Sequence, residues 1–253
     1  MNRKLILIAN KGEDGHELPG VAIDMEHYER FFRSANGGAW EDGEMQIYLE
    51  FSSAQALHDY IMMTNDFHKV DYWLIVFCGH GYLDANDDTI LCMSDGSEVK
   101  VSELKTWVQY TPCTLIADSC RQRAEIEGNL VQLRESMYSE VTIGQDPEAC
   151  KALYNRLLEQ LPCGSFYTAY GASKDECAGD NDELGGIYSF FLLDRADKER
   201  QRLATNLIND GDSFSTLAQV HDIAYPLVIE RRHGQQHPVR SANTGNIPFV
   251  VIA

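Results

Sequence analysis

The segment Tyr72–Phe77, with the sequence YWLIVF, is an apolar run of strand length. An apolar strand without polar alternation is typical of a parallel sheet whose two faces are both covered. Similar short runs occur at Leu5–Ile8 and Thr114–Ala117, and stretches with a helical spacing of apolar residues, such as Val21–Ala35, lie between the strands. Strands that alternate with helices predict an α/β fold, with a mostly parallel sheet and helices on both faces.

The remaining elements are predicted from the same periodicities and from turn and capping residues. Helices are expected from Ser53, from Ser102 to Val108, from Ile187 onwards and over Ser213–Ile229; strands over Met45–Phe51, Ser165–Gly171 and Ile247–Ile252; and a hairpin over Asp88–Val99.

One segment, Arg121–Glu148, does not fit this alternation. It is polar, carries several arginines and has weak periodicity. Long connections inside a compact domain are usually functional or mobile. We therefore expect a mobile or cleaved connection over residues 121–148, with Arg134 as the preferred cleavage site. A plain surface excursion is the alternative.

The charge and the cysteines exclude several classes of function. The chain carries 21 Lys and Arg against 39 Asp and Glu, a formal net charge of −18 over 253 residues. This excess of acid disfavours nucleic acid and anionic membranes as partners, and no apolar run approaches the roughly 18 residues of a membrane span. The seven cysteines are odd in number and contain no CxxC pair, which disfavours a zinc ribbon and a disulfide scaffold. Reduced thiols in a cytoplasmic protein are expected.

The chemistry is concentrated where two predicted strands end. His80 follows one strand in the sequence CGHG, and Cys120 follows the next strand in the sequence ADSC. The carboxyl ends of parallel strands share one edge of a sheet, which is where ligands bind in α/β folds. An imidazole that takes the proton of a thiol is the minimal machinery for thiol nucleophilic catalysis. The N–H groups of Gly81 and Cys120 are expected to form an oxyanion hole.

At these motifs the chain resembles the caspase-like cysteine peptidases, a group that holds caspases, metacaspases and prokaryotic caspase homologues. The matching blocks, in order, are LPGVAIDM, DYWLIVFCGHG, LIADSC, YGASKDECAG with GGIYSFFLL, and QQHP with IPFVV. The resemblance covers nearly the whole chain. It implies a single peptidase domain over residues 1–253, built as a three-layer sandwich around a six-stranded sheet. It also implies His80 as general base or imidazole partner, Cys120 as nucleophile, and protein or peptide substrates.

The resemblance further implies the pocket for the substrate side chain that precedes the cleaved bond, the P1 residue. Asp118 matches the metacaspase motif, because caspases have Gln at this position. The family's second pocket acid falls on Asp24, and Cys78 and Asp175 fall near the same pocket. Two converging carboxylates repel each other unless a cation arrives, so cleavage after Arg or Lys is expected. The structural alternatives are a helix-dipole role for Asp24, a turn cap for Asp118, a core position for Cys78 and a solvated loop position for Asp175.

No cofactor and no metal site is predicted. Some metacaspases need calcium, which binds acids after the GHG motif together with a later pair of Asp residues. This chain has Asp84, Asp87 and Asp88, but the stretch Lys100–Glu103 lacks the expected pair. Isolated acids on a loop are usually solvated or part of a turn.

Two other functions are kept as alternatives. One is a non-catalytic scaffold or binding protein that retains the caspase-like fold, and the other is a different thiol hydrolase or acyltransferase. No GxSxG elbow and no Gly-rich nucleotide loop supports another chemistry. The resemblance to prokaryotic homologues implies a role in antiviral defence or regulated cell death. Activation is expected from a partner protein, from cleavage or from a neighbouring polypeptide.

Overall fold

The computed structural model describes residues 1–12, 17–49, 52–123, 145–210, 213–242 and 246–253. Its centre is a six-stranded sheet in the order β12–β8–β7–β3–β1–β2. The strands are β1 (Arg3–Asn10), β2 (Met45–Tyr48), β3 (Tyr72–Gly79), β7 (Cys113–Asp118), β8 (Phe166–Tyr170) and β12 (Val239–Arg240). Of the pairings in this sheet only β12 with β8 is antiparallel, which confirms the predicted mostly parallel sheet.

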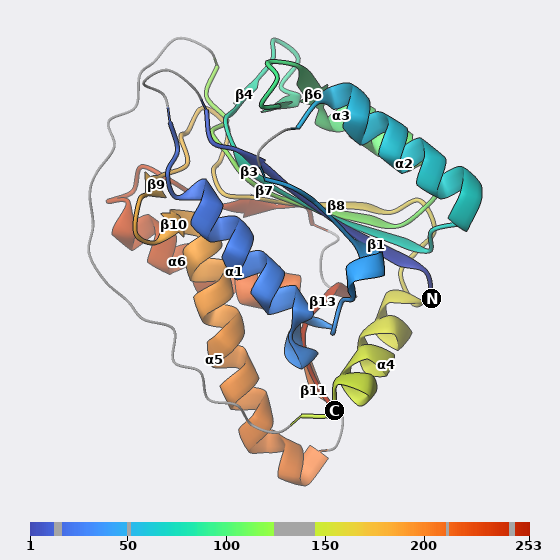
Figure 1. Ribbon diagram of the computed structural model, residues 1–253. Helices are drawn as coiled ribbons and strands as arrows, with labels where there is room; N and C mark the ends of the chain where they lie inside the picture. Colours follow the sequence, from blue (N-terminus) through green and yellow to red (C-terminus); the bar gives the residue numbers. More distant parts are fainter. Residues whose placement is uncertain (13–16, 50–51, 124–144, 211–212, 243–245) are drawn as a thin grey trace.

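Helices cover both faces of the sheet, as predicted (Figure 1). The helices α2 (Ala54–His68) and α3 (Val101–Trp107) lie on one face, and α1 (Val21–Arg33), α4 (Pro147–Leu158), α5 (Ile187–Asp210) and α6 (Leu217–Arg231) lie on the other. Successive residues of a strand therefore enter two separate hydrophobic cores. Ile75 and Phe77 pack in the core with α2 and α3, whereas Leu74 and Val76 pack in the core with α1 and α5. Within the described residues, no helix is both long and apolar enough to cross a membrane.

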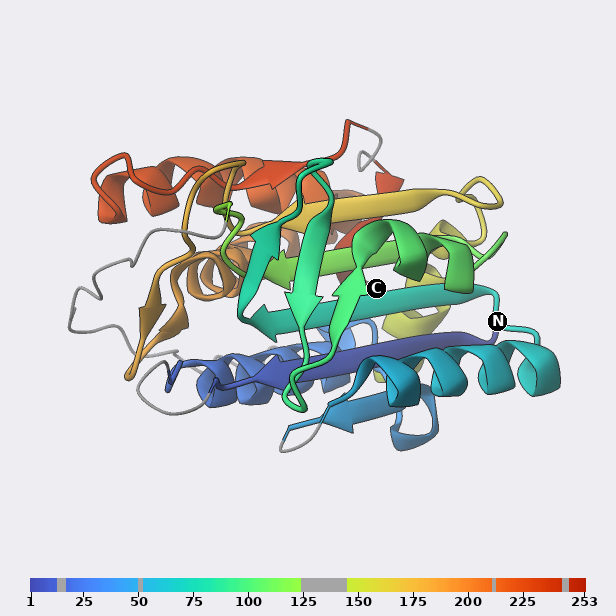
Figure 2. The same cartoon turned by 90° about the horizontal axis from the view of Figure 1, so that it is seen from above.

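Shorter elements surround the central sheet. A separate antiparallel sheet of β4 (Gly81–Leu83), β5 (Thr89–Cys92) and β6 (Glu98–Lys100) follows β3 and lies on the side of α2 and α3 (Figure 2). The hairpin expected over residues 88–99 corresponds to β5 and β6. Further antiparallel pairs are β9 (Asp180–Asn181) with β10 (Gly185–Gly186), and β11 (Ser213–Thr216) with β13 (Pro248–Ile252). The turns η1 (Ala35–Gly37) and η2 (Asp42–Glu44) follow α1.

The helix predicted over Ser213–Ile229 begins later than expected. Residues 213–216 form β11 and pair with β13, so the backbone of this stretch is extended. The helix then begins at Leu217, because the side chain of Thr216 caps it by accepting a hydrogen bond from the N–H of Gln219. The prediction of the boundary was wrong because a local pattern does not show the partner strand, which lies 32–39 residues later in the chain.

Two other helix starts also differ from the sequence analysis. Helix α4 begins inside the predicted connection, where Asp146 accepts hydrogen bonds from two N–H groups of the first turn and Pro147 follows at the start of the helix. Ser102 lies inside the first turn of α3 rather than before it, and its hydroxyl donates to Asp88. The predicted cleavage site, Arg134, lies outside the described residues.

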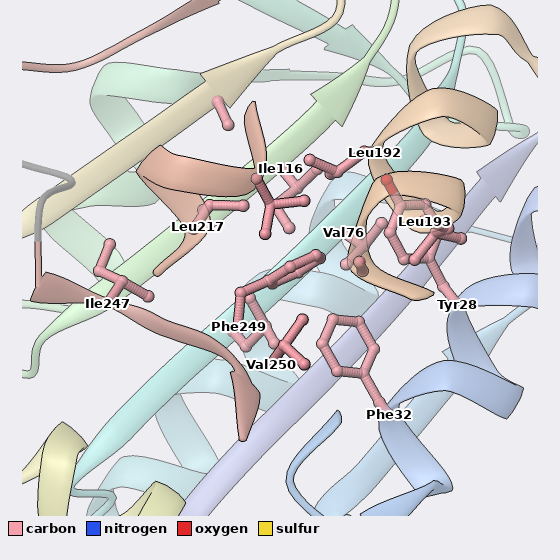
Figure 3. Packing of buried hydrophobic residues seen from close by; sticks show 14 of the residues in the cluster. Tyr28, Phe32, Val76, Ile116, Leu192, Leu193, Leu217, Ile247, Phe249 and Val250 are labelled. Carbon is pink, nitrogen blue, oxygen red and sulfur yellow. The ribbon is translucent and has the colours of Figure 1, made fainter. Parts of the chain in front are cut away.

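Phe249 of β13 lies in the core between the central sheet and α1 (Figure 3). Its side chain is 1% exposed, and its ring centroid lies 4.9 Å from that of Phe31 and 6.1 Å from that of Phe32. All five residues of β13 are buried. The strand predicted over Ile247–Ile252 therefore lines the core and pairs with β11, and it is not part of the central sheet.

Truncation of Phe249 tests this packing. The Phe249→Ala variant should lose about 3–5 kcal/mol of the free energy of unfolding, because the change removes buried ring contacts and leaves a cavity. Urea unfolding followed by circular dichroism measures the loss. The matched control is Phe67→Ala on α2, where the side chain is 76% exposed and the change should be within about 0.5 kcal/mol. Equal losses in the two variants would contradict the assigned core.

Candidate active site

The parallel pairing of β3 with β7 determines where the catalytic candidates lie. Cys78 of β3 pairs in register with Asp118 of β7. His80 follows Cys78 by two residues and Cys120 follows Asp118 by two, so both motifs leave the same edge of the sheet from neighbouring strands. The residues next to them are in close contact, because a Cβ built on Gly81 would lie 2.9 Å from Ser119 Oγ. The structure thus brings the CGHG and ADSC motifs together.

Gly81, the predicted oxyanion donor, is the first residue of β4. The N–H of Cys92 donates to the carbonyl of His80 at 3.1 Å, and Gly81 itself opposes Leu91 of β5. Bonded and non-bonded pairs alternate along an antiparallel ladder, so the pair of Gly81 with Leu91 is a non-bonded one. The N–H of Gly81 therefore points away from β5.

The thiol of Cys120 is half-buried and faces the loop that follows β8. Its Sγ atom lies 3.9 Å from the carbonyl oxygen of Ala178, toward which the thiol donates. A hydrogen bond with the thiol of Cys177, and then burial, raise the pKa of Cys120 well above that of an ordinary thiol. Cys120 is therefore a neutral thiol in this state and needs a base before it can act as a nucleophile.

The carboxyl groups of Asp24 and Asp118 lie together in the interior, and these residues are 1% and 6% exposed. Both oxygens of Asp24 accept hydrogen bonds from the N–H of Gly186, at 3.0 and 2.9 Å, and Asp118 Oδ2 accepts one from the N–H of Ser189 at 2.8 Å. Burial raises the pKa of Asp118 to about 6. Burial and the charge of Asp118 raise the pKa of Asp24 well above its usual range. Both acids are thus held by N–H groups at the start of α5, where a helix favours negative charge.

Asp180 is a third acid at this site, and it was not predicted from the sequence. Its Oδ2 accepts a hydrogen bond from the N–H of Gly20, before α1, at 3.1 Å. The charge of Asp180 raises the pKa of Asp24 and of Asp118. His80, when it is protonated, partly offsets the increase that burial causes in the pKa of Asp180 itself. Asp180 therefore lies near both the acid pair and His80. A single acid among 39 gives no sequence signal, because only the folding of the loop after β8 places it here.

Cys78 forms part of the wall around these acids. Its Sγ lies 3.7 Å from Ser189 Oγ, and its thiol also hydrogen-bonds to Asp24. Burial, followed by the charge of Asp24, raises the pKa of Cys78 well above its ordinary value. A thiol that stays protonated and buried fits a wall of the pocket better than a reacting group.

Two glycines pack directly against the carboxyl group of Asp118. A Cβ on Gly171 would lie 2.3 Å from Asp118 Oδ1, and a Cβ on Gly186 would lie 2.3 Å from Asp118 Oδ2. Asp118 Oδ1 has no hydrogen-bond partner in the part of the chain that the structure describes. The acid cluster, which we define as the carboxyl groups of Asp24, Asp118 and Asp180, forms no ion pair with a lysine or arginine among these residues. Buried negative charge without a counter-charge is costly, so the cluster is suited to a cation.

The QQHP block fixes the loop that runs from Gly171 to Asp180. Gln236 is fully buried, and its Nε2 donates to the carbonyl of Gly171 at 2.8 Å while its Oε1 accepts from the N–H of Gly179 at 2.9 Å. Glu176 accepts a hydrogen bond from the N–H of His237 at 2.7 Å, and its other oxygen lies 2.6 Å from His237 Nδ1. The roles of Gln236 and His237 could not be predicted from the sequence, because their partners lie far away in the chain.

Asp175 lies apart from the acid cluster. Its side chain is 64% exposed and forms an ion pair with Arg123 at 3.6 Å. The structure therefore groups Asp24, Asp118 and Cys78 of the predicted pocket residues, and it leaves Asp175 on the outer side of the loop.

The acids that follow the GHG motif have partners of their own. No group of three or more potential metal ligands occurs among the described residues. The partners are Lys100 for Asp84, Arg123 and Lys174 for Asp87, and Ser102 for Asp88.

Comparison with known proteins agrees with this geometry. The order of the strands and the meeting of the two motifs define an α/β domain of the caspase-like type. Its fold is similar to that of caspase-1 from Spodoptera frugiperda, with a TM-score of 0.56 and 12% sequence identity, over 94% of this chain and 85% of the insect chain. No curated protein matches the sequence. The family model of the caspase domain matches residues 2–244, and the chain belongs to this family of cysteine peptidases.

The burial of Asp118 predicts a pH dependence of stability. An acid whose pKa is higher in the folded than in the unfolded state binds more protons when folded, so stability is lost as the pH rises from 3.8 to about 6. The Asp118→Asn variant cannot ionise. It should therefore be more stable than the wild type at pH 7, by an amount on the order of 1–3 kcal/mol, and the difference should shrink toward pH 4.

Urea unfolding at several values of pH between 4 and 7 measures this difference. The matched control is Asp66→Asn on the exposed surface of α2, which should follow the wild type at every pH. An Asp118→Asn variant that is less stable than the wild type at pH 7 would show that burial does not dominate the pKa of this carboxyl.

Proposed function

We propose that this protein is a cysteine endopeptidase that cleaves protein or peptide substrates after Arg or Lys. The observation that carries the proposal is the acid cluster, which lies without a paired lysine or arginine in the described chain, next to the strand edge that bears His80 and Cys120. Membership of the caspase family supports the cysteine-peptidase chemistry, and the acid cluster supports the preference for a positively charged P1 side chain.

In the proposed mechanism His80 takes the proton of the Cys120 thiol as the substrate binds. The thiolate attacks the scissile carbonyl carbon, and the N–H groups of Gly81 and Cys120 bind the oxygen on which negative charge develops. His80 then gives the proton to the departing amine, which leaves an acyl group on the sulfur. A water molecule that His80 deprotonates hydrolyses this thioester and restores the thiol. A general base is required because Cys120 is a neutral thiol in the resting state.

Electrostatics explain the proposed choice of P1. The charges of Asp118 and Asp180 raise the pKa of Asp24, and a guanidinium among these carboxyl groups would relieve this repulsion. At an effective dielectric of about 20, one ion pair at 4 Å is worth about 4 kcal/mol before desolvation. Asp118 Oδ1 is an unused acceptor, and Arg can donate two parallel hydrogen bonds to a carboxylate. An acidic P1 side chain would add a further like charge and is expected to be rejected.

The wider setting is also part of the proposal. A single peptidase domain over residues 1–253 is supported by the family match over residues 2–244. A cytoplasmic role in prokaryotic antiviral defence or regulated cell death rests on the resemblance of the motifs to prokaryotic homologues. Activation would come from a partner protein, from cleavage or from a neighbouring polypeptide. The net charge of −18 supports basic substrates and disfavours nucleic acid and anionic membranes.

The catalytic pair is tested by Cys120→Ala and His80→Ala. Each variant should cleave fluorogenic peptidyl-arginine substrates at least about 1000-fold more slowly than the wild type, because the nucleophile or its base is missing. Circular dichroism establishes that the variants are folded. A peptidyl-arginine chloromethyl ketone should label Cys120 in the wild type, as mass spectrometry of the digest can show. A folded wild type that neither cleaves nor is labelled would favour the non-catalytic scaffold.

The P1 preference is tested with peptides that differ only at P1. Arg and citrulline have similar shapes, but only Arg is charged, so the ratio of their kcat/KM values isolates the contribution of charge. Asp118→Asn should lower kcat/KM for the Arg peptide roughly 30- to 1000-fold, which corresponds to a loss of about 2–4 kcal/mol of transition-state stabilisation. It should affect citrulline much less, because no ion pair is lost.

The control for this experiment is Glu183→Gln, which removes an exposed acid from the turn between β9 and β10. Its kcat/KM values should stay close to those of the wild type. A wild type that prefers Asp at P1, or an Asp118→Asn variant that keeps the preference for Arg over citrulline, would refute the proposed pocket even where Cys120 proves catalytic.

A further inference from the structure

Cys177 lies next to the candidate nucleophile. The N–H of Arg121 donates to the carbonyl of Glu176 at 2.8 Å, and a second backbone hydrogen bond returns from the same loop to the carbonyl of Arg121 at 2.9 Å. On the other side of Cys177, the carbonyl oxygen of Ala178 lies 3.9 Å from Cys120 Sγ. The two residues that flank Cys177 are therefore both in contact with the segment Cys120–Arg121.

The two thiols also interact directly. Cys120 and Cys177 are each half-buried, so a small molecule can reach them. Neither of their sulfur atoms is in a disulfide. The hydrogen bond between them lowers the pKa of Cys177, and the positive charge of Arg232 lowers it further, although burial acts in the opposite direction. Cys177 is thus the more acidic thiol of the pair, and the thiolate is the form that reacts with oxidants.

The loop that carries Cys177 is held on both sides. On one side, Glu176 accepts hydrogen bonds from the N–H groups of Ser173 and His237, at 3.2 and 2.7 Å. On the other side, the N–H of Gly179 donates to Gln236 at 2.9 Å. A disulfide requires its two cysteines to be held close together, and these bonds keep Cys177 against Cys120 in the absence of substrate.

We infer that Cys120 and Cys177 form an oxidative modification site, at which hydrogen peroxide converts the two thiols to a reversible disulfide that blocks the nucleophile. The consequence for cleavage rests on the proposed function, whereas formation of the bond depends only on the two thiols.

The reaction balances with one peroxide molecule. The Cys177 thiolate attacks one oxygen of hydrogen peroxide, breaks the O–O bond and becomes a sulfenic acid, and the released hydroxide takes a proton to give water. Cys120 then loses its proton, and its sulfur attacks the sulfur of the sulfenic acid. The S–O bond breaks, and the departing hydroxide also becomes water. Two thiols are oxidised to one disulfide, and peroxide is reduced to two molecules of water.

The remaining cysteines have different surroundings. Cys78, Cys113 and Cys150 are buried, and burial raises the pKa of Cys92 to about 11. Cys163 is exposed, and its thiol donates to the carbonyl oxygen of Tyr110 at 3.0 Å. It is the most accessible thiol of the chain and serves as the matched control.

The inference is tested on the full-length protein treated with hydrogen peroxide. Free thiols are blocked by alkylation, and the digest is examined by mass spectrometry without reduction. We expect a linked peptide that contains Cys120 and Cys177 and disappears on treatment with dithiothreitol. Cleavage of peptidyl-arginine substrates should fall about tenfold or more on oxidation and return on reduction.

Variants distinguish the disulfide between Cys120 and Cys177 from the oxidation of single cysteines. Cys163→Ser should respond to peroxide like the wild type. The activity of Cys177→Ser in peroxide is compared with that of the same variant kept reduced. Its loss of activity should resist dithiothreitol, because Cys120 then proceeds to the sulfinic acid. Cys177→Ala serves the same purpose where the serine variant fails to fold.

Oxidised wild type without the linked peptide, or reversible inactivation that persists in Cys177→Ser, would overturn the inference. A linked peptide in a protein that shows no cleavage even when reduced would instead support the inference and refute the proposed function.

Discussion

The in-register contact between β3 and β7 is the constraint on which the site depends. Side chains alternate between the two faces of a strand, so a slip of one residue would exchange the two hydrophobic cores. Because β3 is buried on both faces, such a slip is strongly disfavoured. The same register that fills the cores also sets Cys78 opposite Asp118. Packing in the interior thereby determines which residues meet just beyond the strand ends.

The acid cluster destabilises the folded state, whereas the two hydrophobic cores stabilise it. Burial disfavours the ionised forms of Asp24 and Asp118, and the N–H groups at the start of α5 offset only part of that cost. Sites that bind charged ligands commonly carry such local instability, because the ligand supplies the missing counter-charge. Gly171 and Gly186 belong to the same arrangement, since any side chain at either position would collide with Asp118.

The parts of the structure that local sequence determines were predictable, and the parts that depend on distant segments were not. Burial on both faces makes β3 visible as an apolar run, and His80 and Cys120 follow directly after their strands. Asp180 and Gln236 carry no local pattern. Gln236 bonds to a carbonyl 65 residues earlier, so its role becomes apparent only after the loop and the sheet are placed. The late start of α6 has the same cause, because β11 pairs with a strand that lies 32–39 residues later in the sequence.

These long separations also set the order in which the site can be built during synthesis. Asp24 accepts its hydrogen bonds from Gly186, 162 residues later in the chain, and the loop after β8 is fixed by a hydrogen bond from Gln236. Contacts between distant segments form slowly, and a chain leaving the ribosome cannot make them until their later partners have emerged. A nascent polypeptide therefore carries His80 and Cys120 well before the acid cluster beside them is assembled. Under the proposed function, the timing of biosynthesis would separate the reactive side chains from the recognition of substrate.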